Sequence, residues 1–231
     1  MNQMNDVLAK SAATPLAFFF AVLFFFSGAI AMAADTGLES QLLEIQHRWA
    51  TANYEESGRA QKKALGRLLD DARALAKANP RRAEALVWQG IVASTYAGVK
   101  GPFGAMSLAK EARDALMAAE AIDPTVLQGS VYTSLGTLYY KVPGGIIGFG
   151  DKNVAREYLE KAIQANPDGI DPNYFYGEFL LEQEDYAGAQ RALLKARNAP
   201  TRPSRTLADK GRQREIAALL DQVNSKLHGR S

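Results

Sequence analysis

The sequence predicts an all-α protein, a solenoid of paired helices with about nine helices in all and a C-terminal helix that caps the stack. Three observations lead to this prediction. Helix signals fill the chain after residue 34, with no strand alternation competing with them. One spacing of alanine, leucine and proline occurs three times, and an amphipathic segment at 208–227 follows the last copy.

The repeated pattern is Ala-x3-Leu-x2-Ala, and it begins at Ala112, Ala155 and Ala189. A proline follows each copy within five residues. Residues three and four apart share one face of a helix, small alanines let a neighbouring helix approach closely, and proline stops the helix. Each copy therefore predicts the second helix of a helical pair.

The first helix of the middle pair carries Tyr-x2-Leu-Gly-x2-Tyr at 132–139. This motif resembles the Trp-x2-Leu-Gly-x2-Tyr signature of the tetratricopeptide repeat, whose second helix carries the alanine and proline pattern. Looser copies flank it, and the resemblance covers residues 85–124, 129–167 and 170–203. It implies a stack of helix pairs that acts in protein–protein interaction.

In this family, residues of the first helices line a concave groove. The resemblance therefore implies groove positions at Gln89, Tyr96, Thr133, Thr137, Tyr140, Lys141, Tyr174 and Glu178. Tyrosine offers a large contact area with a polar tip, so this groove suits an extended peptide or a small molecule. The register of the first repeat has two readings, because either Trp88 takes the aromatic position or Gly90 takes that of the signature glycine.

Two adjacent repeats are longer than the third. From the start of the first-helix pattern to the first alanine of the second helix, the interval is 16 residues in the last repeat, 23 in the middle one and 24 in the first. We expect insertions of seven and eight residues in the turns at 142–150 and 98–106, lying side by side. A phosphate-binding loop is excluded, since no strand precedes the glycines and Asp151, a predicted helix cap, follows them.

The two inserted segments carry five large apolar side chains, which are Phe103, Met106, Ile146, Ile147 and Phe149. Either these residues fold back as plugs over the ends of their helix pairs, or they form an exposed apolar lip. A lip of this kind would hold a protein segment or a small apolar ligand.

The N-terminus predicts export. No charge occurs between Lys10 and Asp35, and the apolar stretch at 16–26 is followed by Ala31-Met32-Ala33. We expect a signal peptide at 1–33, cleaved after Ala33, and a single periplasmic domain at 34–231 with no stable membrane anchor. The alternative is an uncleaved N-terminal anchor with the domain facing the periplasm.

Composition excludes several functions. The mature chain would have 26 basic and 24 acidic residues, without the basic excess that nucleic acid requires. With no cysteine and two histidines, metal clusters and Cys/His nucleophile pairs are also excluded, and no cofactor is expected. The arginines at 202, 205, 212 and 214 are expected on a solvated or internally paired face.

The sequence thus predicts a non-catalytic binding module that acts as a scaffold for a protein partner or peptide segment. The alternative is a small apolar-ligand-binding accessory of a transport system, because the chain is loosely similar to the periplasmic T-components of TRAP transporters.

Overall fold

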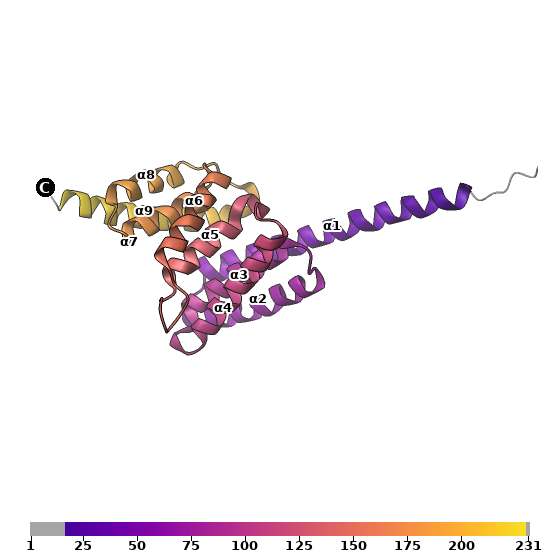
Figure 1. Ribbon diagram of the computed structural model, residues 1–231, viewed down its shortest axis with the longest axis horizontal. Helices are drawn as coiled ribbons and strands as arrows, with labels where there is room; N and C mark the ends of the chain where they lie inside the picture. The colour runs from indigo at the N-terminus through magenta and orange to yellow at the C-terminus, as the bar shows by residue number, and fades with distance from the viewer. Residues whose placement is uncertain (1–16, 230–231) are drawn as a thin grey trace, which may run out of the picture. The chain divides into compact units, whose positions relative to one another are not determined.

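The computed structural model describes the backbone of residues 17–229 and the side chains from residue 36 onward except Pro102. This range holds nine α-helices, one short 3-10 helix and no β-strand, which confirms the predicted all-α fold (Figure 1). The elements are α1 (Ala17–Tyr54), α2 (Gly58–Ala78), α3 (Ala83–Lys100), α4 (Pro102–Ile122), α5 (Val126–Lys141), α6 (Lys152–Ala165), α7 (Ile170–Glu182), α8 (Tyr186–Arg197), η1 (Pro203–Arg205) and α9 (Thr206–His228).

The chain divides into two compact units, residues 1–40 and 41–231, and helices α2 to α9 all belong to the second. The predicted signal peptide, with its cleavage after Ala33, falls on residues whose side chains lie outside the described part of the chain. It stays a prediction. Among the described residues, the helices are too short or too polar to cross a bilayer.

Three successive helix pairs pack side by side along the chain (Figure 1). They are α3 with α4, α5 with α6, and α7 with α8. The repeated pattern builds their cores, because its alanines and leucines at 112–119, 155–162 and 189–196 are almost wholly buried. Helix α9 packs on α8, with Ile216, Leu220 and Val223 in the core that the last two pairs share. The predicted capping helix is therefore confirmed.

A glycine on each first helix lets the paired helix approach. A Cβ atom added at Gly90, Gly136 or Gly177 would lie 2.6, 2.7 or 2.8 Å from the Cγ atom of the leucine facing it, at Leu116, Leu159 or Leu193. No real Cβ atom tolerates such distances, so the three glycines are equivalent. Gly90 thus takes the place of the signature glycine, and the register that put Trp88 at the aromatic position is wrong by two residues.

The corrected register changes the length of the first insertion. The glycine-to-leucine interval is 16 residues in the last pair, 23 in the middle and 26 in the first, so the first insertion is ten residues long instead of eight. These residues also do not form the predicted loop. They lengthen α3 and α4 to 18 and 21 residues, against 13 and 12 in the last pair.

The two insertions take different forms because their glycines and prolines are spaced differently. Gly101, with φ of 90°, ends α3, and Pro102 at once begins α4, which bends at Phe103 and Gly104. The 142–150 segment instead stays a loop until Asp151, whose carboxylate accepts hydrogen bonds from the backbone N–H groups of Asn153 and Val154 at 2.8 and 3.2 Å. The predicted cap at Asp151 is confirmed.

Candidate functional site

The two inserted segments touch, as expected. A Cβ atom at Gly148 would lie 2.9 Å from the Cε atom of Met106, so the 142–150 loop rests against the start of α4. The loop closes on itself through a hydrogen bond from the Gly150 N–H to the Pro143 carbonyl, 3.0 Å long. Its tip, from Gly144 to Ile147, is exposed.

The five apolar residues of these segments do not all behave alike. Two of them pack against the fold, as expected of plugs, and three are exposed, as expected of a lip. Phe149 is half-buried, with its ring edge-to-face on Tyr139 at 5.5 Å and under the Arg113 guanidinium at 4.6 Å. Met106 is half-buried as well. These two residues are plugs, because their apolar groups pack against the fold.

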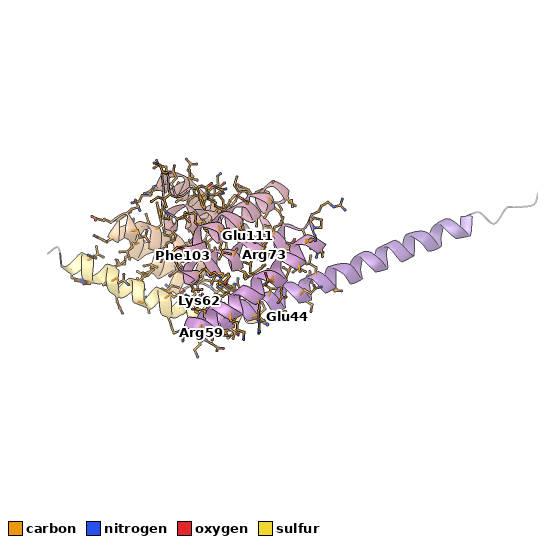
Figure 2. All side chains as sticks on the ribbon, turned by 90° about the horizontal axis from the view of Figure 1, so that it is seen from below. Glu44, Arg59, Lys62, Arg73, Phe103 and Glu111 are labelled. Atoms are coloured by element: carbon orange, nitrogen blue, oxygen red, sulfur yellow. The ribbon has the colours of Figure 1, made fainter. Side chains whose placement is uncertain are left out.

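The other three apolar residues are open to solvent. The exposed fractions are 92% for Phe103, 107% for Ile146 and 74% for Ile147 (Figure 2 labels Phe103). Large apolar residues exposed to this degree gain nothing from the fold, so they are available to a partner. We call Phe103, Ile146 and Ile147 the apolar edge.

The predicted groove residues of α5 and α7 lie together in one network. The Tyr140 hydroxyl donates a hydrogen bond to the Glu178 carboxylate. Lys141 Nζ lies 3.1 Å from Glu178 and 2.6 Å from Glu182. Burial, and then the charge of Glu178, raise the pKa of Tyr140 well above its usual value, so Tyr140 stays a neutral hydrogen-bond donor.

Three further groove positions also take part in contacts within the fold. Thr133 and Tyr174 are buried, and the Thr137 hydroxyl donates to the Thr133 carbonyl at 2.8 Å. Tyr174 is covered by the Arg212 guanidinium, 4.2 Å from its ring centroid. These residues contribute to packing between helices and offer little free surface.

Gln89 and Tyr96 do not take groove positions, because they were placed in the wrong register. The Gln89 amide donates to Glu111 on α4 at 3.2 Å, and Glu111 also pairs with Arg73 on α2 at 2.6 and 2.7 Å (Figure 2). Tyr96 lines a surface hollow of about 400 Å³ between α2, α3 and α4. The positions implied by the corrected register are instead Val87, Ile91, Ser94 and Thr95.

Sequence reasoning missed a segment that covers part of the groove. Residues 202–215, here called the clasp, contact the first helices α1, α3 and α7. The clasp reaches α1 where His47 Nε2 lies 2.8 Å from the Ser204 carbonyl oxygen and the Tyr54 hydroxyl donates to Glu215 at 3.2 Å. It reaches α3 where the Arg205 guanidinium lies 5.3 Å from the Trp88 ring centroid.

The clasp meets α7 through Asp171, which two arginines share. The Asp171 carboxylate lies 2.7 Å from Arg202 and 3.0 Å from Arg212. Burial alone would raise the pKa of Asp171, but the charges of Arg212 and Arg202 outweigh it and hold the pKa well below the usual range. Asp171 is therefore ionised at neutral pH.

Within the clasp, Asp209 holds Arg202. Its carboxylate accepts from the Arg202 backbone N–H at 2.8 Å and from the guanidinium at 2.5 and 2.8 Å. The expectation of an internally paired arginine face is thus right for Arg202 and Arg212. The partner across the groove, Asp171, had no signal beyond its place in the first turn of α7.

The fold and these surfaces define a helical-repeat protein, in which stacked helix pairs present a concave groove and a row of inter-helix turns. Residues 148–204 match the family model described as the tetratricopeptide repeat. This match confirms the predicted family in the part of the chain that holds α6, α7 and α8. No curated protein shows significant sequence similarity to the chain.

Proposed function

We propose that the chain is an exported, non-catalytic interaction module that binds a protein partner through its apolar edge. The tetratricopeptide repeat supports the general role, since repeats of this family are protein-interaction modules. The observation that carries the proposal is the exposure of Phe103, Ile146 and Ile147 on two touching segments. The clasp covers the part of the groove around Tyr174, so this part is closed to a partner.

The partner presents an apolar segment that covers the edge. Burial of three large apolar side chains removes them from water, and each contributes about 1.5 to 3 kcal/mol when it is fully buried. The glycines at 144, 145 and 148 let the loop adjust its backbone to the partner's surface. Binding therefore needs no rearrangement of the helix pairs.

Export to the periplasm rests on the N-terminal sequence, with its uncharged stretch and the Ala31-Met32-Ala33 site. A membrane-anchored form that faces the same compartment would present the same edge to a partner. The hollow beside Tyr96 is lined by Asp70, Arg73 and Lys100 among others, so it does not favour an apolar ligand.

The proposal is tested with a photo-reactive residue placed at Ile147 and, as a matched control, at Met117. Met117 is a large apolar residue exposed by 47% on α4, outside the inserted segments. We expect irradiation in cells to join one protein to position 147 and nothing to position 117, and the double variant Phe103→Ser with Ile146→Ser to abolish the capture. Equal capture at both positions, or capture that survives the double variant, would refute binding through the apolar edge.

A further inference from the structure

Helix α9 and the residues before it hold the fold in two chemically different ways. Its second half is an apolar anchor, since Ile216, Leu220 and Val223 are buried against the last helix pairs. The clasp at 202–215 is instead held by charged side chains, above all Arg202 and Arg212. Release of the clasp would break these ionic contacts and the packing of Ala208 and Gly211, while the apolar anchor stays on α8.

The clasp fits the groove incompletely where it crosses α3. The Trp88 Nε1–H and Arg205 Nε–H groups are buried, and neither has a hydrogen-bond partner among the described residues. Arg205 also forms no ion pair with a carboxylate in this part of the chain, and its guanidinium lies on the Trp88 ring. A buried donor without an acceptor weakens the contact, because water satisfies it once the segment is released.

The residues of α3 and α7 that contact the clasp are nevertheless well suited to bind arginine side chains. Asp171 offers both carboxylate oxygens to guanidinium groups, at 2.7 and 3.0 Å. Three aromatic rings receive guanidinium groups on their faces, those of Trp88, Tyr174 and Phe175, with centroid distances of 4.2 to 5.3 Å. Carboxylates and aromatic faces are both favourable partners for an arginine guanidinium.

We propose that this face of the groove, made by Asp171, Trp88, Tyr174 and Phe175, is a second binding site for an arginine-bearing peptide segment, which the clasp occupies in cis. A partner segment with arginines at similar spacing, and with an acceptor for the Trp88 Nε1–H group, displaces the clasp. The site is distinct from the apolar edge, and its occupation by the chain itself keeps it closed until such a segment competes.

The test uses the whole chain and a fluorescent peptide with the sequence of residues 200–214. Asp209→Ala removes the carboxylate that holds Arg202 inside the clasp and leaves the receiving residues unchanged. Asp221→Ala is the matched control, because Asp221 is exposed on the same helix. We expect the peptide to bind Asp209→Ala at least ten times more tightly than it binds the unaltered chain or Asp221→Ala.

Two further measurements test whether the peptide binds at the proposed site. A peptide with its arginines at 202, 205 and 212 replaced by alanine should not bind. Adding Asp171→Asn to Asp209→Ala should abolish binding of the natural peptide. The proposal is overturned if Asp209→Ala binds no more tightly than the control, or if either change leaves the affinity unchanged.

A second variant that weakens the contacts of the clasp is needed in case Asp209→Ala does not fold. Arg205→Ala uncovers Trp88 and leaves no carboxylate without its partner, since Arg205 forms no such pair among the described residues. If circular dichroism shows that Asp209→Ala is unfolded, Arg205→Ala should bind the peptide at least several times more tightly than the unaltered chain does. An equal affinity of Arg205→Ala and the unaltered chain would then refute the proposal.

Discussion

The concave groove and the apolar edge differ both in their side chains and in how well those side chains are covered. Charged side chains are covered in the groove, whereas apolar side chains are exposed at the edge. Where the clasp meets the groove, Asp171 pairs with Arg202 and Arg212, and Arg205 stacks on Trp88. The edge holds Phe103, Ile146 and Ile147, and these apolar side chains are bare. The charged side chains of the groove thus form contacts within the fold, while the apolar side chains of the edge remain available to a partner.

In this protein, the burial of a side chain depends on which segment the chain passes over it as much as on the type of residue. The clasp is covered because η1 and the first half of α9 contact α1, α3 and α7, while α9 also packs on α8. The tip of the 142–150 loop has no segment to cover it, since Phe149 and Met106 already complete the packing beneath it. Substitutions in the two regions should therefore have very different consequences.

The largest effect is expected at Asp171. Asp171→Asn leaves the guanidinium of Arg212, whose side chain is only 8% exposed, without a carboxylate across the groove. Loss of one partner from a buried pair destabilises by about 3 kcal/mol. Urea unfolding measures the change, and Asp168→Asn is the control, because Asp168 forms only an exposed pair with Lys195 that contributes less than about 1 kcal/mol. Equal effects of the two substitutions would show that the clasp does not stabilise the fold.

The stability of the fold should also decrease in acid. The folded protein holds the pKa of Asp171 and that of Glu111 below their usual values, the latter through hydrogen bonds from Arg73. Their stabilising contribution is present above the unfolded carboxyl pKa of about 4 and is lost as the pH falls below it. We expect the difference in unfolding free energy between the natural chain and Asp171→Asn to shrink between pH 7 and pH 3.

A constant difference between pH 7 and pH 3 would contradict the role given to the Asp171 carboxylate. Variants of the apolar edge provide the comparison, because their side chains do not titrate. The difference that each of them shows from the natural chain should be the same at both pH values.

A smaller effect is expected from Phe149→Ala. The half-buried ring packs on Tyr139 and beneath Arg113, so its loss should cost about 1.5 kcal/mol, less than the value for a wholly buried phenylalanine. Thermal unfolding measures this cost. A change below about 0.5 kcal/mol would place Phe149 with the exposed residues of the edge instead of among the plugs.

The smallest effect on stability is expected within the apolar edge. Ile147→Ala removes a side chain that is 74% exposed, and the unfolding free energy should change by less than about 0.5 kcal/mol. The same substitution should weaken binding of the partner at the apolar edge. A large loss of stability would mean that Ile147 packs within the fold.

Much of the fold follows from the sequence, because the spacing of Ala112, Leu116 and their counterparts is set by helix geometry and close packing. The caps at Asp151 and Asp185 were predictable for the same local reason; the Asp185 carboxylate accepts from the Gly188 N–H at 2.9 Å. The touching of the two inserted segments followed from the equivalence of turns along a solenoid edge. Local rules and repetition suffice for such features.

Long-range pairing was harder to predict. The clasp joins Arg202 and Arg212 to Asp171, residues 31 and 41 positions apart, and nothing local marks that meeting. The register of the first repeat failed because Trp88 matched the signature by residue type, whereas the close approach of Leu116 to Gly90 decides it. The division of the five apolar residues into plugs and edge also depends on packing between turns.

The central claim is that a protein partner binds at the apolar edge while the clasp keeps the groove closed. The most direct measurement is the dissociation constant of the partner captured at position 147, for the natural chain and two matched variants. We expect Phe103→Ser with Ile146→Ser to weaken binding at least tenfold, and Thr137→Ala, at a predicted groove position that bonds within α5, to leave it unchanged. Weaker binding by Thr137→Ala, together with unchanged binding by the edge variant, would contradict the account.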